Sequence, residues 1–250
     1  MTPVVGSGGD RPIVRTDGDP PVPRSASVAV GTMLILGVFT SLAGTLVLGE
    51  RFNGAGAVAA AGDHQSRVMT SAVLQLVTAA GAVGIALGFH ALLRSHCPTL
   101  AVGAVAFRGV EAVFAAGSAF ALVALVVLAQ LPSGSVEQPG IASLGLVVTS
   151  LRDASHFGFG VVFYGFGALL TYVALLKSRL LPRALVVWGV IGVVLIFCTA
   201  LLGLSDGPPY AIDGWRTVLA APIALQELVM AVWLISRGPS SSPAVAASTD

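Results

Sequence analysis

The chain has 250 residues, of which 55% are hydrophobic and only 10% charged, and its 13 Lys and Arg nearly balance its 12 Asp and Glu. A soluble domain carries about 25% charged residues, so this composition excludes an ordinary water-soluble protein, and the apolar content excludes a disordered chain. A net charge of +1 argues against a nucleic-acid partner, and two cysteines are too few for a disulfide framework. An integral membrane protein remains, with the lipid bilayer as its partner.

The two ends of the chain differ in composition from everything between them. Residues 1–24 are rich in proline, glycine and charged residues, and residues 238–250 are rich in serine, proline and alanine. Such segments do not bury enough apolar surface to fold. We therefore expect two disordered cytoplasmic tails, 1–24 and 238–250, around a membrane domain at 25–237.

The stretch between the tails predicts six transmembrane helices. Four runs contain no Asp, Glu, Lys or Arg, and two further apolar stretches are interrupted by Arg108 and Glu111 and by Glu227. Each run exceeds the ~20 residues that cross a ~30 Å hydrocarbon core, and none alternates as a barrel strand does. The predicted fold is all-α, a polytopic membrane protein with six transmembrane helices in one bundle. The predicted spans are about 25–49, 68–93, 99–130, 154–177, 183–205 and 217–236.

Shorter features lie within and between these spans. Residues 141–155 are expected to form a short interfacial helix leading into the fourth span. Gly81, Gly84 and Gly88 lie on one side of the second span, a pattern that favours close helix packing. Pro182 is expected to open the fifth span, because proline is tolerated in a first helical turn.

The distribution of Lys and Arg predicts the orientation. Eight of these residues fall on the side of the termini and four on the other, which places both termini in the cytoplasm and the protein in the inner (plasma) membrane. Lys177 and Arg183 then lie at the cytoplasmic headgroup level. They are a candidate site for anionic lipid, or they act only as a topology signal.

Three charged residues are expected near the middle of the bilayer. By a rise of ~1.5 Å per residue, Arg108 and Glu111 lie about 14 and 18 Å into the third span, and Glu227 about 17 Å into the sixth. A charge at that depth costs ~2.5–3.5 kcal/mol, so each side chain should face the protein interior and find a partner. We therefore predict a buried cluster of Arg108, Glu111 and Glu227, which either only fixes helix register and topology or forms a binding or proton-coupled site.

The cluster contains one more acidic than basic group, so either one carboxyl is protonated or another cation or ligand is bound. Small residues share the faces of these charges: Ala104, Ala115 and Ser118 in the third span, and Ala220, Ala224 and Ala231 in the sixth. We expect the two small-residue faces to pack together. Gln75, Thr78 and Gln226 are candidates to complete the hydrogen bonding of the cluster.

Motifs for other chemistry are missing from the sequence. It contains no His-Glu-x-x-His metal motif, no phosphate-binding loop and no dinucleotide fingerprint, so no catalytic residue, metal or cofactor is predicted. His90, His96 and Cys97 are near one another, but their spacing is not that of a standard metal site. His156 with Asp153 and Arg152 is expected to form a polar rim at the outer start of the fourth span, which is either a candidate entrance or simply an interfacial border, the reading that we favour.

Several segments together resemble a known bacterial membrane family. They are Ser178–Gly189 (SRLLPRALVVWG), the motif Pro222-x-x-x-Gln226-Glu227 followed by VWLI, and Arg108-x-x-Glu111. This combination resembles the family catalogued as domain of unknown function 4386, over about residues 25–238. The resemblance implies a six-helix membrane fold with no established activity or cofactor. Gln75 departs from the family pattern, which often has an acidic residue there.

Three functions are compatible with these features. The first is a non-enzymatic accessory, binding or sensing component with a buried polar cluster. The second is a transporter of small solutes or a proton-coupled carrier that uses Arg108, Glu111 and Glu227. The third, an intramembrane lipid-modifying enzyme, needs an activated nucleophile or a metal cluster, and the sequence indicates neither.

Overall fold

The structure is a computed structural model that describes residues 24–49, 52–131, 138–207, 210 and 214–239. The predicted tails, 1–24 and 238–250, lie outside the described residues except for Arg24 and residues 238–239. Within the described part of the chain, six helical stretches are long and apolar enough to cross a membrane, which confirms the six predicted spans. They are α1 (Arg24–Leu48), α3 (Gln65–Leu93), α4 (Pro98–Ala129), the stretch Pro139–Ser178, α7 (Arg183–Asp206) and α8 (Trp215–Ser236).

The fourth stretch is longer than the sequence predicts. Helix α5 (Gln138–Asp153), a π-helical turn η3 (Ala154–Gly160) and α6 (Val161–Ser178) follow one another without a break. A 40-residue helix is about 60 Å long, twice the hydrocarbon core. In place of the separate interfacial helix expected at 141–155, the structure therefore has an extension of the fourth span itself. A short 3₁₀ turn η2 (Gly54–Gly56) and α2 (Ala57–Asp63) pack beside this extension.

The helix ends agree with local sequence signals. Pro98 lies in the first turn of α4, and Pro182 directly precedes α7, as expected for proline at a helix start. Helix α6 ends where Arg179 adopts a left-handed conformation with φ 56°, and its N–H donates to the Leu175 carbonyl. Gly49 ends α1 in the same region with φ 71°.

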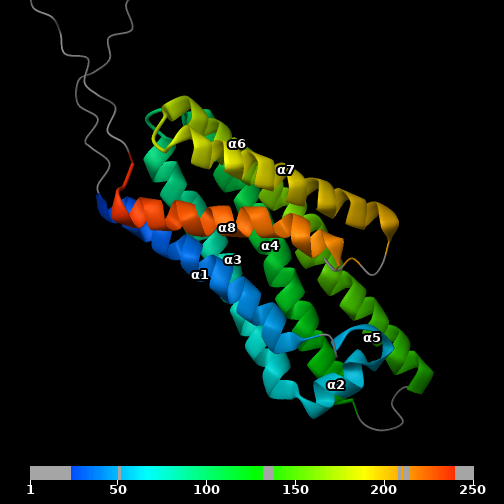
Figure 1. The fold of residues 1–250 in the computed structure, drawn as a ribbon. Coiled ribbons are helices and arrows are strands. Elements are labelled where there is room, and N and C mark those ends of the chain that lie inside the picture. The colour runs from blue at the N-terminus through cyan, green and yellow to red at the C-terminus, as the bar shows by residue number, and fades with distance from the viewer. Residues whose placement is uncertain (1–23, 50–51, 132–137, 208–209, 211–213, 240–250) are drawn as a thin grey trace, which may run out of the picture.

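The six long helices contact one another in a closed ring. The contacts run from α1 to α3, then to α4, α6, α7 and α8, and α8 packs against α1 again. The start of α1, the end of α8 and the α3–α4 and α6–α7 turns lie at one end of the bundle, which we call the terminal end (Figure 1). Helices α2 and α5 lie at the opposite end, called here the far end (Figure 1).

Two hydrophobic cores stabilise the ring. The first fills the terminal half and includes Leu34, Phe89, Tyr172, Val193 and Leu234, drawn from α1, α3, α6, α7 and α8. The second lies at the far end and joins Leu48 and Phe52 to α2, α3 and α4. No described residue of α7 or α8 belongs to this second core. Beyond the first core, α8 is therefore less firmly held than α3 and α4.

Glycines bring α1 close to α3. A Cβ atom at Gly88 would lie 2.2 Å from Cγ2 of Val30, and one at Gly84 would lie 2.8 Å from Sδ of Met33. Gly81, in contrast, has nothing within 4 Å of its Cβ position. Two of the three glycines expected to support packing therefore lie in the helix contact.

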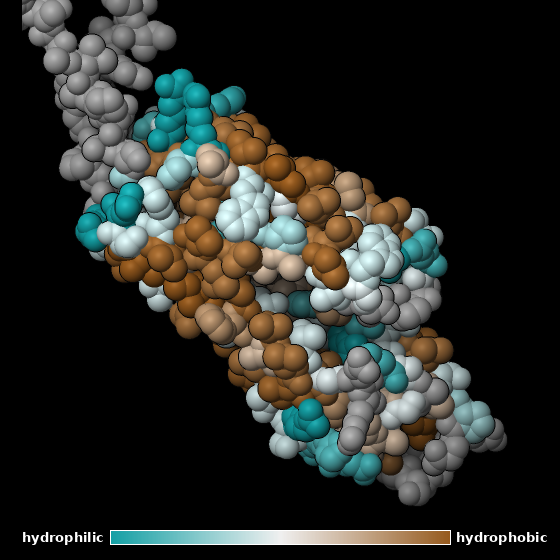
Figure 2. Space-filling view, viewed as in Figure 1, coloured by the Kyte–Doolittle hydropathy of each residue, from teal (hydrophilic) through white to brown (hydrophobic). Residues whose placement is uncertain are grey.

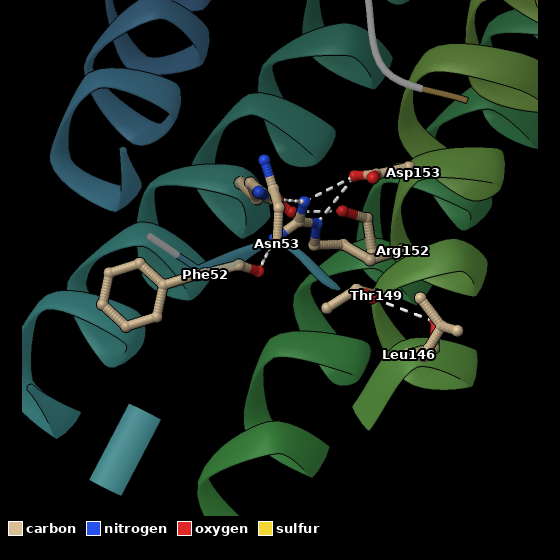
Figure 3. A network of polar contacts seen from close by, with 8 residues as sticks. Phe52, Asn53, Leu146, Thr149, Arg152 and Asp153 are labelled. Carbon is tan, nitrogen blue, oxygen red and sulfur yellow. Dashed lines mark hydrogen bonds and ion pairs between the residues drawn. The ribbon is translucent and has the colours of Figure 1, made fainter. Parts of the chain in front are cut away.

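Arg152 on α5 is paired with Asp153 and links the segment just before η2 to the long helix (Figure 3). Arg152 Nη2 is 2.6 Å from Oδ1 of Asp153, and both side chains are buried. The same guanidinium donates to the Phe52 carbonyl at 3.3 Å and to Oδ1 of Asn53 at 2.7 Å. The sequence interpretation of Arg152 and Asp153 as a polar border is therefore wrong, because the segment 52–63 folds over them and removes them from the surface.

Replacing Gly88 with alanine should destabilise the bundle. Val30 is buried and β-branched, so it has little freedom to move away from a new methyl group. We expect a loss of about 1–3 kcal/mol, seen as a lower thermal midpoint in detergent. Gly81→Ala on the same helix is the control and should keep or raise the midpoint, since alanine is the better helix former. Equal midpoints for the two variants would contradict the packing role of Gly88.

Replacing Arg152 with glutamine should loosen the far end. Asp153 would then stay buried without its partner, which costs about 3 kcal/mol, and residues 52–63 would lose their link to the long helix. Hydrogen exchange of that segment should accelerate while α7 keeps its protection. The double variant R152Q/D153N should recover part of the stability, and neutralising the exposed Arg94 should change neither measurement.

Candidate functional site: a charged cavity between α1 and α8

A cavity of about 420 Å³ lies inside the ring. It lies next to the first hydrophobic core, on the side that points to the far end of the bundle. Helices α1, α3, α4, α6 and α8 and the π-helical turn all contribute to its walls. Figure 2 shows the surface hollowed between α8 and α1, with hydrophilic groups inside the hollow. The cavity exists because small residues line it where large ones would fill it: Ala115, Ala220 and Ala224.

The first charged pair of the cavity is on α4. Nη1 of Arg108 is 2.8 Å from Oε2 of Glu111, and the side chains are 9% and 17% exposed. Because the two residues are three apart, they share one helix face. Gly167 on α6 makes room for the arginine, since a Cβ there would lie 2.8 Å from Cγ of Arg108.

A tyrosine connects this pair to the opposite side of the ring. The Tyr164 hydroxyl on α6 donates a hydrogen bond of 2.8 Å to Oε1 of Glu227 on α8. The guanidinium of Arg108 lies over the ring of the same tyrosine, 4.9 Å from its centroid. Arg108, Glu111 and Glu227 thus line one cavity, joined through a single aromatic side chain.

The π-helical turn aims further groups into the cavity. Residues Ala154–Gly160 form a π-helix, a distortion found frequently at functional sites. His156, Phe157 and Gly160 from this turn line the cavity. His156 therefore lies in its wall, not only at a border of the span.

Not every residue of the predicted cluster reaches the cavity. Gln226 faces away from it, accepts a hydrogen bond of 2.6 Å from Tyr172 and donates one of 3.1 Å to the Leu185 carbonyl. Gln75 accepts a hydrogen bond of 2.6 Å from Ser118, between α3 and α4. Thr78 does line the cavity, and its hydroxyl lies 2.8 Å from that of Thr40.

The small-residue faces of α4 and α8 do not pack together as expected. Both helices are described along their full length and stand on opposite sides of the ring, in contact with different neighbours. Ala224 borders the empty volume instead of α4. Small residues allow any neighbouring helix to approach closely. The sequence therefore does not indicate which helix of the ring packs against each of these faces.

The mouth of the cavity lies among apolar side chains that face outward. Leu42 on α1 lines the cavity and is 54% exposed, and Leu225 on α8, next to cavity-lining Ala224, is 55% exposed. Glu227 lies about 18 Å from the start of α8, near the middle of a ~30 Å core. The cavity follows α8 from this depth to Thr217, close to the start of the helix.

The cavity combines features of a binding site. Its volume is within the 300–1,000 Å³ of ligand pockets, and a few polar groups converge on mainly apolar walls. Within the described residues, no group of three or more His, Cys, Asp or Glu side chains is placed to hold a metal ion. Organic ligands with a polar end are the chemistry that these groups can recognise.

Sequence reasoning missed Tyr164. Tyrosines in membrane helices gather at the interfaces, whereas this one lies in the interior of the bundle beside Arg108 and Glu227. Its distance from either end of the fourth span was a usable signal, because a hydroxyl at such depth needs a hydrogen-bond partner. The space that Gly167 leaves for Arg108 depends on the α4–α6 contact and has no signal in the sequence.

Neutralising one member of the Arg108–Glu111 pair should be more harmful than neutralising both. Either R108Q or E111Q leaves a largely buried charge without its partner, which costs about 3 kcal/mol. The double variant should recover much of the thermal midpoint in detergent. The matched control is the same set of single and double variants at the Arg216–Asp206 pair. Because Asp206 is exposed, the coupling free energy of that pair should be less than about 1 kcal/mol. Strictly additive losses at Arg108 and Glu111 would contradict the pairing.

Comparison with known proteins gives one match. The model of a family described as a domain of unknown function (DUF4386) matches residues 29–238, which includes all the residues of the cavity. No match was found among the curated proteins or among the solved structures. Because the match covers most of the chain, this multi-pass membrane protein belongs to the DUF4386 family.

Proposed function

We propose that this protein is a non-enzymatic binding or sensing component of the membrane, which holds a small molecule in the cavity between α1 and α8. The open cavity around Arg108, Glu111 and Glu227 is the observation that carries the proposal. A role limited to fixing the helix register would need only the ion pair, and a filled interior would satisfy it better. Ionisable groups inside membrane proteins usually mark such sites.

The proposal includes an orientation. Both termini are cytoplasmic, and the protein resides in the inner (plasma) membrane, which the excess of Lys and Arg on that side supports. Lys177 and Arg183 are exposed at the terminal end of the bundle. In this orientation they bind anionic lipid headgroups.

Filling the cavity should remove its ligand. Ala224 lines the cavity, so Ala224→Phe places a ring inside it, whereas Ala221→Phe on the same helix adds a ring to an exposed position. We expect native mass spectrometry of protein purified in mild detergent to show small-molecule adducts on the wild type and on the Ala221 variant. The Ala224 variant should lose them while it keeps the elution volume of the folded protein. The same adducts on all three proteins would refute binding in this cavity.

A carrier is the second candidate, favoured by the asymmetry of the cavity. The cavity reaches Glu227 and opens in the far half, whereas Gly31 seals α1 against α8 near the terminal end, where its Cβ position is 2.7 Å from the Ala231 carbonyl oxygen. Pro222, inside α8, weakens that helix one turn before Glu227. Net flux of the bound molecule across protein-containing liposomes would assign transport, and binding without flux would assign sensing.

A further inference from the structure

We propose that the ligand is a compact organic cation, an ammonium group on an apolar body, which enters between α1 and α8 and binds at Glu227. This inference rests on the proposed function, since it names the class of molecule that the cavity holds.

The charged side chains of the cavity favour a cationic ligand. Arg108 is already engaged by Glu111 and by the Tyr164 ring. Glu227 belongs to none of the ion pairs of the described residues, and its hydrogen-bond donor, the Tyr164 hydroxyl, is neutral. Oε2 of Glu111 lies 2.8 Å from Nη1 of Arg108, so the charge of Glu111 is already offset by the arginine and the charge of Glu227 is not. The cavity therefore has acceptor capacity for a cation, while its guanidinium is occupied.

The aromatic side chains in the walls of the cavity also favour an organic cation. Tyr164 and Phe157 both line the cavity, and Tyr164 is hydrogen-bonded to Glu227. An aromatic face attracts an organic cation and also packs against its apolar body. An anion would meet these rings and two acidic side chains, and the basic residues among the described lining residues are His156 and Arg108, which is already paired with Glu111. The combination of carboxylate and aromatic ring selects an ammonium group over a carboxylate or phosphate.

The mouth and the volume define the body of the ligand. Leu42 lines the cavity and is exposed, so the opening has an apolar edge that suits an apolar ligand body. A volume of about 420 Å³ is in the lower part of the range of pockets for drug-sized ligands. This space suits a body of a few rings or one short chain, and not a two-chain phospholipid.

Three molecules of equal shape and different charge test the inference. The probes are 1-adamantylammonium, 1-adamantanol and 1-adamantanecarboxylate, each added to the full-length protein in detergent. Affinity is measured by the rise of the thermal midpoint with probe concentration. On the wild type we expect the ammonium to bind about tenfold or more tightly than the alcohol, and the carboxylate most weakly, because a hydrogen-bonded charge pair exceeds a neutral contact.

Glu227→Gln is the decisive variant. It should remove the preference for the ammonium while it keeps binding of the alcohol, which also shows that the variant is folded. Asp63→Asn, which neutralises an exposed carboxylate outside the cavity, should preserve the preference. If Glu227→Gln does not fold, Glu111→Gln takes its place and should reduce the same preference.

The outcomes separate the two proposals. Equal binding of ammonium and alcohol, abolished by Ala224→Phe but not by Ala221→Phe, would overturn the cationic ligand and leave the binding cavity standing. An ammonium preference that survives in Glu227→Gln would also overturn it. Failure of all three probes to bind, together with adducts that are unchanged in Ala224→Phe, would refute both proposals.

Discussion

The requirement that charge inside a membrane be paired organises this protein. Arg108 and Glu111 meet on α4, and Tyr164 connects them to Glu227 across the ring. Each group would be costly in contact with lipid, so the helices that carry them must turn these faces inward. Their neighbours are small residues, and the result is a polar volume that the surrounding helices enclose without filling.

Helix length explains why that volume stays open. Helices α3, α4 and the α5–α6 stretch are long enough to form a second core with α2 at the far end. Helices α7 and α8 are shorter and contribute only to the first core. Near its start, α8 therefore lies beside the cavity and not in a packed core, and a gap remains between it and α1. The Arg152 network strengthens the opposite wall by tying the π-helical region to the segment before α2.

Much of this architecture follows from the chain alone. The apolar runs identify the six spans, since each is long enough to cross a bilayer and carries too few charges to leave it. The i, i+3 spacing of Arg108 and Glu111 predicts their shared face, and the glycine pattern of the second span predicts a close helix contact, found at Gly84 and Gly88. These features are local, so helix geometry is enough to derive them.

Other features depend on which helices become neighbours. The small faces of α4 and α8 suggested direct packing, yet α6 and α7 complete the ring between them. Tyr164, Gly167 and the buried Arg152 acquire their roles only through partners distant in the chain. The sequence by itself determined the number of spans and the shared face of Arg108 and Glu111, because these depend on hydrophobic length and helical geometry. Tertiary structure alone decided the cavity and its mouth, because an empty volume is a property of several helices together and leaves no periodic trace in any one of them.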